Sequence, residues 1–289
     1  MLELHPHLHV GTSSFSSTDW IGSFYPPETR PTDFLSYYAT KFDCVEIDAT
    51  YYRAPTLQMT ARWAEVTPPH FRFSLKVPKI ITHDKALSLA EKEWAQFLRV
   101  VDPLGEKLAF LVLQFPYWNR KSEIPDLATF IQRLDMFVQR SKCPYRLVVE
   151  TRNPKWIGKE LLDFLRSRHL ILALQDQQWM PRPRELWDKW DVRLKTGESV
   201  YVRMLGERER IEKLIAKRKA IEEKEKKPVT PEWSKIVIDR TEETKEWLPI
   251  IKSFLAQSAE VDLYYNNHYA GFGPASIELL TMLFRASPA

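Results

Sequence analysis

Short apolar segments recur along the chain, and segments with helical periodicity separate them. Several of the apolar segments are hydrophobic at nearly every position, as the sequences LAFLVLQF and LILAL show. Strands that are buried on both faces have this composition, which is typical of a parallel sheet. We therefore predict eight strands, over residues 8–12, 44–48, 71–77, 108–115, 147–151, 170–175, 200–205 and 261–265.

The intervening segments place apolar residues at intervals of three and four, as an amphipathic helix does. Within 126–138, for example, Leu127, Phe130, Leu134 and Val138 fall on one stripe. Further helices are predicted from residue 31 onwards and over 158–168, 232–255 and 274–283. Pro249 should kink or break the helix that contains it, because proline removes a backbone hydrogen bond.

Strands and helices that alternate through the whole chain indicate an α/β fold. Eight strands favour a closed, TIM-barrel-like (β/α)8 barrel, which we predict as a single domain over residues 1–289. A doubly wound open sheet is the alternative. No G-x-G-x-x-G motif follows the first predicted strand, so the dinucleotide-binding version of that alternative is disfavoured.

One segment after the seventh predicted strand departs from this pattern. Residues 206–227, GERERIEKLIAKRKAIEEKEKK, contain nine basic and six acidic residues and few apolar ones. Interleaved charges suit pairs four residues apart on an exposed helix. We predict a charged helical excursion over 206–235, and an arm that contacts nucleic acid is the alternative.

Polar side chains lie at the end of every predicted strand. In a parallel barrel these ends meet at one face, and the active sites of such barrels lie there. Residues two apart on a strand point to the same face, which applies to Glu46 with Asp48 and to Glu150 with Arg152. The residues in question are Thr12, Ser13, Glu46, Asp48, Lys76, Gln114, Glu150, Arg152, Gln175, Asp176, Arg203, Asn266, Asn267 and His268.

The carboxylates within strands are the most informative of these residues. Burying Glu46 or Glu150 costs several kcal/mol unless a cation pairs with the carboxylate. Lys76, Arg152 and Arg203 are the candidate partners. The charges therefore form either a functional site or a structural network that plugs the mouth of the barrel.

Composition narrows the class of protein further. The net charge of +4 is too small to indicate nucleic-acid binding by itself. Cys44 and Cys143 form no metal-ligand or redox motif, which favours a reducing, cytoplasmic compartment. The N-terminus lacks the pattern of a secretory signal, and the longest apolar run is far shorter than the ~20 residues of a membrane helix, so we expect no membrane association.

Several longer motifs resemble those of a known family, the YecE-like family, or domain of unknown function 72. They are GTSSFSSTDWIGSFYPP, FLSYYATKFDCVEIDATYYRAP, FRFSLKVPKIITH, KLAFLVLQFP, VVETRNPKW, YVRMLG and YYNNHYAGFGP, and they occur in the family's order over nearly the whole chain. The resemblance implies a TIM-barrel-like fold, in agreement with the strand count. It implies no reaction, because the activity of the family is not established.

The resemblance also singles out positions. Three departures from the family pattern are Ser14-Phe15-Ser16-Ser17 near the start, Gly271-Phe272-Gly273 near the end, and Leu205 in place of a histidine after Arg203. A role that rests on that imidazole is therefore in doubt for this chain. The residues that match family motif positions are Glu46, Lys76, His83, Gln114, Glu150, Arg152, Asp176, Arg203, Asn266 and Asn267.

The first functional hypothesis is an enzyme, independent of metal, that acts on a small anionic or carbohydrate-like substrate. Glu46 and Glu150 would be the catalytic acid and base, with pKa values separated by their different neighbours. Cationic side chains would bind a phosphate or carboxylate, and amides would orient the ligand. The predicted substrate-binding residues are Lys76, His83, Gln114, Arg152, Asp176, Arg203, Asn266 and Asn267.

Two other functions stay open. A metal-dependent hydrolase or isomerase would draw its ligands from Glu46, His83, Glu150, Asp176 and His268. Non-catalytic binding of a nucleotide or nucleic acid would use basic side chains beside aromatic ones. The sequence identifies neither a cofactor nor a substrate.

Overall fold

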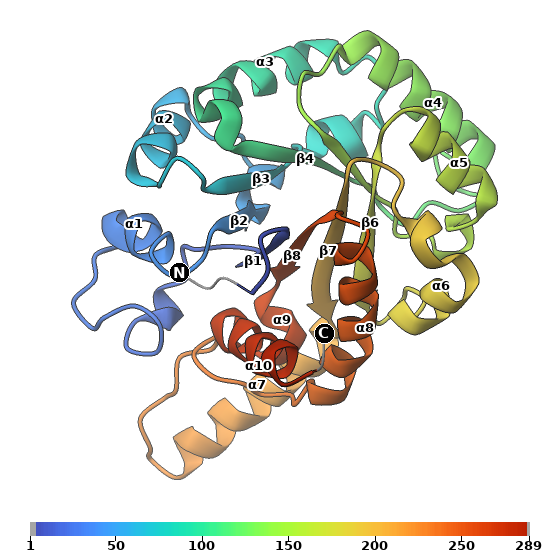
Figure 1. The fold of residues 1–289 in the computed structure, drawn as a ribbon. Helices are drawn as coiled ribbons and strands as arrows, with labels where there is room; N and C mark the ends of the chain where they lie inside the picture. Colours follow the sequence, from blue (N-terminus) through green and yellow to red (C-terminus); the bar gives the residue numbers. More distant parts are fainter. Residues whose placement is uncertain (1–3, 288–289) are drawn as a thin grey trace.

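Eight parallel strands form a closed barrel in the computed structural model, which describes residues 4–287 (Figure 1). Each strand pairs with the next one along the chain, and β1 pairs with β8. The predicted TIM-barrel-like architecture is therefore confirmed. The strands are β1 (Leu8–Thr12), β2 (Cys44–Ile47), β3 (Arg72–Lys76), β4 (Leu108–Gln114), β5 (Leu147–Glu150), β6 (Ile171–Gln177), β7 (Ser199–Gly206) and β8 (Glu260–Tyr265).

Helices surround the strands on the outside of the barrel, as Figure 1 shows. No helix within residues 4–287 has the length and apolar character needed to cross a membrane. The helices are α1 (Phe34–Tyr38), α2 (Leu57–Val66), α3 (Glu91–Val101), α4 (Leu127–Ser141), α5 (Lys159–Ser167), α6 (Pro183–Trp190), α7 (Arg208–Lys224), α8 (Thr241–Leu255), α9 (Asn267–Ala270) and α10 (Gly273–Ala286).

The helix boundaries follow local chemistry. Asp126 caps α4, because its carboxylate accepts a hydrogen bond from the backbone N–H of Thr129. The helix predicted over 232–255 begins only at Thr241, and it continues through Pro249, so the proline does not break it. Seven buried residues anchor α8 to the barrel, and this packing outweighs the missing backbone hydrogen bond.

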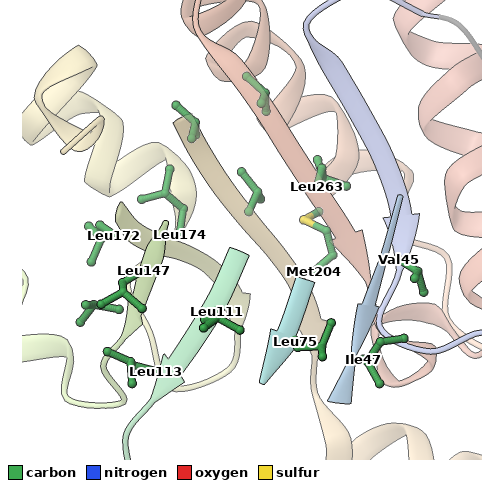
Figure 2. Close-up of a cluster of buried hydrophobic side chains, with 14 of the residues drawn as sticks. Val45, Ile47, Leu75, Leu111, Leu113, Leu147, Leu172, Leu174, Met204 and Leu263 are labelled. Carbon is green, nitrogen blue, oxygen red and sulfur yellow. The ribbon is translucent and has the colours of Figure 1, made fainter. Parts of the chain in front are cut away.

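Alternate side chains of each strand point outward and pack against the helices. Figure 2 shows this layer, which includes Val45, Leu75, Leu113 and Leu263. The apolar face of α4 contributes Phe130, Leu134 and Phe137 to the same core. The outward-pointing side chains of the strands, together with the apolar faces of the helices, therefore form the main hydrophobic core.

The inward side chains fill the barrel in layers that differ in polarity. At the N-terminal end, Arg72 pairs with Asp262 and Glu260 at 3.0 and 3.2 Å. The middle layer is largely apolar, although the Ser74 hydroxyl bonds across the barrel to Tyr201 at 2.6 Å. Above it, at the C-terminal ends of the strands, lie the charged residues that the sequence singled out.

Helix α7 lies within the charged segment that follows β7 and has a small apolar cluster of its own. Ile211 and Ile215 on α7 pack against Ile238, with Trp233 and Val237 at the edge, and this cluster is separate from the main core. In Figure 1, α7 extends outward from the ring of helices. The start of α7 nevertheless borders the barrel mouth, because it follows β7 directly.

Gly206, at the end of β7, is required by the close approach of α9. Its φ is +70°, and a Cβ there would lie 2.6 Å from the backbone oxygen of His268 and from the Cα of Tyr269. We expect Gly206→Ala to lower the free energy of unfolding by about 2–3 kcal/mol, measured by urea titration.

The matched control for this prediction is Gly22→Ala. Gly22 also has a positive φ, +84°, but nothing lies within 4 Å of the added Cβ. That variant should lose only the ~1 kcal/mol of the left-handed backbone. Equal losses in the two variants would show that α9 does not constrain Gly206.

Candidate functional site

A cavity of about 410 Å³ opens at the C-terminal ends of the strands. Its size lies in the usual range for small-molecule sites, roughly 300–1,000 Å³. Most of its wall is polar or charged, in contrast to the middle layer of the barrel. The lining residues are Asp48, Tyr51, Tyr52, Lys76, Gln114, Arg152, Gln177, Arg203, Leu205, Gly206, Arg208, Asn266 and His268.

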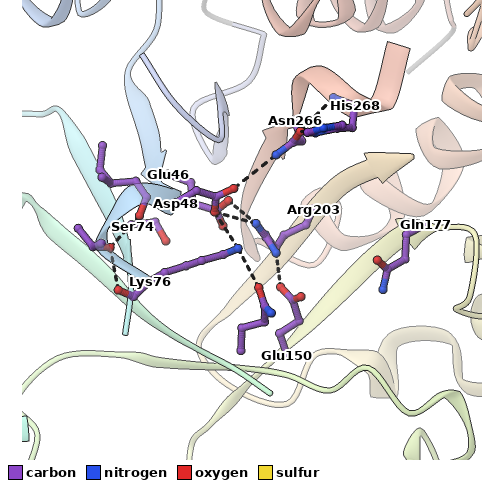
Figure 3. A network of polar contacts seen from close by, with 12 residues as sticks. Glu46, Asp48, Ser74, Lys76, Glu150, Gln177, Arg203, Asn266 and His268 are labelled. Carbon is purple, nitrogen blue, oxygen red and sulfur yellow. Dashed lines mark hydrogen bonds and ion pairs between the residues drawn. The ribbon is translucent and has the colours of Figure 1, made fainter. Parts of the chain in front are cut away.

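Arg203 is the centre of the charged network beneath this cavity (Figure 3). Its guanidinium is fully buried and pairs with Glu46 at 2.7 Å, with Asp48 at 3.0 Å and with Glu150. Burial alone would lower the pKa of Arg203, but Glu150, Glu46 and Asp48 outweigh burial and raise it. Arg203 is therefore a permanent cation held by three carboxylates.

Lys76 and Arg152 flank Arg203 and reach the cavity wall. The Lys76 ammonium lies 2.9 Å from Asp48 and donates to the Gln114 side-chain oxygen at 2.8 Å. The Arg152 guanidinium donates to Glu150 at 2.8 Å and to the Gln177 side-chain oxygen at 2.7 Å. The structure thus brings together the three cations that the sequence predicted as partners of the strand carboxylates.

Glu46 and Glu150 have different electrostatic environments although both are fully buried. Burial raises the pKa of Glu46, and Arg203 offsets this only partly. Burial also acts to raise the pKa of Glu150, but Arg203 and Arg152 outweigh it and lower the pKa to about 2. Burial acts to raise the pKa of Asp48 as well, but Lys76 and Arg203 outweigh it and lower the pKa.

Glu46 and Glu150 lie deeper in the barrel than their predicted role as catalytic acid and base requires. Neither Glu46 nor Glu150 lines the cavity; both lie below it, under Arg203. The carboxylate in the cavity wall is that of Asp48. A group that lies beneath the wall touches a ligand only through its neighbours, so the two glutamates hold Arg203 and Asp48 in place.

The amide side chains around the cavity have their oxygens occupied by protein donors. Lys76 occupies the oxygen of Gln114, Arg152 that of Gln177, and His268 that of Asn266. An ammonium has three N–H donors and a guanidinium five, so Lys76 and Arg152 retain donors beyond their protein partners. The wall therefore offers more donors than acceptors.

An aromatic rim borders the cavity on the side of β2 and β3. Tyr51 and Tyr52 line it, and the Tyr52 side chain is 77% exposed. The His83 ring lies 5.0 Å from the Tyr51 ring, outside the lining. Burial, with a contribution from Arg152, lowers the pKa of His83 to about 4 although Asp84 opposes it. His83 is therefore a neutral support for Tyr51 at neutral pH.

The structure does not bring Asp176 and Asn267 to the cavity. The Asp176 carboxylate accepts hydrogen bonds from Trp247 at 2.9 Å and Arg182 at 3.4 Å, on the outer side of the barrel. The Asn267 side-chain oxygen accepts from the backbone N–H of Gly273. Asp176 follows the inward-facing Gln175 on β6, so strand alternation turns it outward, whereas Asn267 is the first residue of α9.

The predicted catalytic and substrate-binding residues leave out four polar residues that line the cavity. Alternation along the strand had already placed Asp48 on the face of Glu46, and it would also have placed Gln177 on the face of Gln175. Arg208 and His268 come from α7 and α9, and no periodic signal in the sequence places a helix start over the barrel mouth.

No three His, Cys, Asp or Glu side chains within 4–287 lie close enough together to hold a metal ion. The ligand types proposed for a metal are dispersed: Asp176 faces outward and His83 lies behind Tyr51. Glu46 and Glu150 are paired with Arg203. Of the five proposed metal ligands, His268 alone lines the cavity among the described residues.

Comparison with known proteins identifies the relatives of the chain. The model of the family described as "Protein of unknown function DUF72" matches residues 9–289. A UPF0759 protein, YecE from Escherichia coli, is 32% identical over 152 residues, which are 53% of this chain and 51% of YecE. YunF from Bacillus subtilis is 28% identical over 181 residues, 59% of this chain and 61% of YunF. The chain thus matches between half and two thirds of the length of these relatives.

Solved structures resemble the fold over nearly the full chain. A DUF72 family protein from Thermotoga maritima has a TM-score of 0.72 at 24% identity, covering 97% of this chain and 99% of that one. A DUF72 family protein from Enterococcus faecalis has a TM-score of 0.66 at 19% identity, covering 98% and 97%. At this level of identity the likeness shows the barrel fold.

Proposed function

The chain belongs to the DUF72 family, and from that premise we propose an enzyme that binds a small anionic ligand and transfers protons at its barrel mouth. The observation that carries the proposal is the composition of the cavity wall. Lys76 and Arg152, which have more N–H donors than protein partners, line the cavity, whereas protein donors already occupy the oxygens of Gln114, Gln177 and Asn266. A ligand rich in acceptor oxygens, such as a phosphate or carboxylate, complements such a wall.

In this proposal the cations have distinct roles. Lys76 and Arg152 contact the oxyanion, and Arg203 supplies a fixed positive charge beneath it. Glu150 stays ionised and positions Arg203, because a carboxyl with a pKa of about 2 does not exchange protons near neutral pH. This replaces the acid or base role expected for Glu150 from the sequence.

The proposed acid–base unit is Glu46 with Asp48. Their pKa values are displaced in opposite directions, that of Glu46 upward by burial and that of Asp48 downward, because Lys76 and Arg203 outweigh burial. Two carboxyls whose environments separate their pKa values are the usual arrangement of an acid and a base. Asp48 lines the cavity, so it is the member that would contact the ligand, with Glu46 as its buried proton-holding neighbour.

The other predicted binding residues fall into two groups. Gln114 and Asn266 line the cavity and would orient the ligand. His83 lies outside the lining and supports the Tyr51 ring. Asp176 and Asn267 are left out of the proposed contacts, because their side chains bond elsewhere. A cytoplasmic location belongs to the proposal as well, and the free thiols of Cys44 and Cys143 support it.

Nucleotide binding without catalysis is a second candidate. The exposed ring of Tyr52 and the guanidinium of Arg208 line the same cavity, and an aromatic ring beside a cation suits a base and a phosphate. A nucleoside monophosphate would then bind more tightly than inorganic phosphate. Equal affinities would count against this candidate.

The proposed anion site is tested with inorganic phosphate as the probe. We expect phosphate at low ionic strength to raise the midpoint of thermal unfolding of the wild type, as any ligand of the folded state does. Arg152→Met should weaken the phosphate affinity at least tenfold, about 1.4 kcal/mol, in isothermal titration calorimetry. This variant leaves Glu150 paired with Arg203, so the fold should be retained.

The matched control is Arg133→Met. The Arg133 side chain is 28% exposed and that of Arg152 is 30% exposed, and each forms an ion pair. Arg133 does not line the cavity, so its variant should bind phosphate as the wild type does. The anion site is rejected if the wild type does not bind phosphate at low salt, or if both variants lose affinity equally.

A further inference from the structure

We propose that His268 is a second proton acceptor of the barrel-mouth cavity, in addition to Asp48, with Nε2 as the atom that takes up the proton. This inference rests on the proposed anion site and adds a catalytic group to it. His268 lies on α9, directly after β8, and its side chain lines the cavity together with Asp48 and Arg208. Figure 3 shows it beside Asn266 at the edge of the charged network.

The hydrogen bonds of Asn266 fix the tautomer of the imidazole. The Asn266 side-chain nitrogen donates to Asp48 at 3.4 Å, which assigns the amide oxygen to the side of His268. That oxygen accepts from the His268 backbone N–H at 3.0 Å and lies 2.6 Å from Nδ1. An amide oxygen only accepts, so Nδ1 carries the hydrogen. In the neutral ring the lone pair is then on Nε2.

This arrangement is that of an oriented base. A general base needs one ring nitrogen held by a partner and the other directed at the reacting group. Asn266 holds Nδ1, so Nε2, which lies 3.5 Å from a carboxylate oxygen of Glu212, is the nitrogen that can take up a proton. The Trp233 ring packs beside the imidazole, with the ring centres 4.8 Å apart, and contributes no charge.

The charged groups that face His268 come from two elements. Arg208 and Glu212 lie on α7, and Asp48 follows β2. Burial and Arg208 lower the pKa of His268, and Glu212 and Asp48 oppose them. Burial and Arg208 outweigh Glu212 and Asp48, so the pKa of His268 is lowered. This favours a neutral ring, able to accept a proton, near pH 7.

Glu212 is placed to stabilise the product of the transfer. Its carboxylate oxygen lies 3.5 Å from Nε2, longer than a strong hydrogen bond but close enough to attract an imidazolium. In the step, the lone pair of Nε2 forms a bond to hydrogen and the O–H bond of the ligand breaks. The electron pair of that bond stays on the ligand oxygen, and its negative charge faces Lys76 and Arg152.

The test follows the seven histidines by nitrogen-15 NMR across a pH titration, with His268→Gln used for assignment. Without ligand we expect a neutral His268 with hydrogen on Nδ1 at pH 7. Saturating inorganic phosphate should raise its pKa by at least about one unit, a tenfold change in proton affinity, because a nearby anion favours the imidazolium. Glu212→Gln should reduce that rise, and the exposed His70 should not move.

A second measurement, by calorimetry, determines how many protons the protein takes up when phosphate binds. At a pH between the two midpoints, phosphate binding should take up protons, so its calorimetric enthalpy should depend on the ionisation enthalpy of the buffer. His268→Gln should lose that dependence and still bind phosphate. Its binding shows that the variant is folded.

The outcomes separate the two proposals. A charged His268, or hydrogen on Nε2 at pH 7, overturns the role of His268 and leaves the anion site standing. Phosphate binding with an unchanged titration of His268, or buffer dependence that persists in His268→Gln, does the same. Absence of phosphate binding to the wild type rejects the anion site and, with it, this inference.

Discussion

Replacing Arg203 by methionine should lower the free energy of unfolding by at least about 3–5 kcal/mol at pH 7. The fully buried guanidinium is shared by Glu46, Asp48 and Glu150, and its loss leaves three carboxylates with too little positive charge. Urea titration at constant ionic strength measures the change. Arg184→Met is the control, because the Arg184 side chain is 66% exposed and its ion pair with Asp188 should contribute less than ~1 kcal/mol.

The pH dependence of the free energy of unfolding of Arg203→Met shows whether unpaired charge or lost packing destabilises the variant. Without Arg203, the buried carboxylates should titrate above their values in the unfolded chain, so the folded state binds more protons. Between pH 7 and pH 5 the variant should therefore recover part of its lost stability relative to the wild type. A deficit that does not change with pH would mean that lost packing, and not unpaired charge, is responsible.

A compensated variant gives a further check. Adding Glu46→Gln and Glu150→Gln to Arg203→Met removes two of the three carboxylates that lose Arg203 as a partner. Replacing a buried ion network by neutral groups of similar shape is often close to neutral in stability. We therefore expect the triple variant to be more stable than Arg203→Met alone, and a simple sum of losses would contradict a coupled network.

Glu150→Gln should lower the free energy of unfolding by about 3 kcal/mol at pH 7. The carboxylate is fully buried, and Arg203 and Arg152 outweigh burial and lower its pKa from 4.5 to about 2. A displacement of that size corresponds to ~3 kcal/mol. Glu246→Gln is the control, since the Glu246 side chain is 43% exposed and pairs with Arg182 at the surface.

The sign of the pH effect follows from the lowered pKa. Such a group stabilises the folded state above its ordinary pKa of 4.5, and the stabilisation disappears as the pH falls towards about 2. The difference between wild type and Glu150→Gln should therefore be constant from pH 7 to pH 5 and shrink below that.

The opposite result would also be informative. A functional site often holds charges in arrangements that reduce stability, so removal of such a charge is neutral or stabilising. If Glu150→Gln proves as stable as the wild type, Glu150 is not the anchor of Arg203 that its burial and contacts indicate. The role of Glu150 as a catalytic acid or base, which the sequence suggested, would then be favoured again.

The sequence by itself determined the barrel. Eight apolar segments, each followed by a helix or a turn, predict eight parallel strands, and the strands lie within one to two residues of the expected bounds. This worked because strands buried on both faces must be apolar along their length. The charged residues that interrupt them, such as Glu46, Glu150 and Arg203, were identifiable because a buried charge needs a partner.

Only the tertiary structure decided which polar strand ends face the cavity and which lie under it or outside it. Asp176 and Gln175 are neighbours in the sequence, yet the alternation of β6 sends one to Trp247 and the other into the barrel. Glu46 and Glu150 are catalytic candidates by sequence, but the depth of the barrel places them beneath Arg203. Depth along the barrel axis depends on how the strands are staggered, which no local pattern encodes.

Contributions from outside the strands were also decided by tertiary packing. His268 reaches the cavity because Gly206 lets β7 pass within contact distance of α9, and Arg208 reaches it because α7 begins directly after β7. Sequence periodicity reports which face of a helix is buried. It does not report the surface on which that face packs, and that contact places His268 beside Asn266 and Glu212.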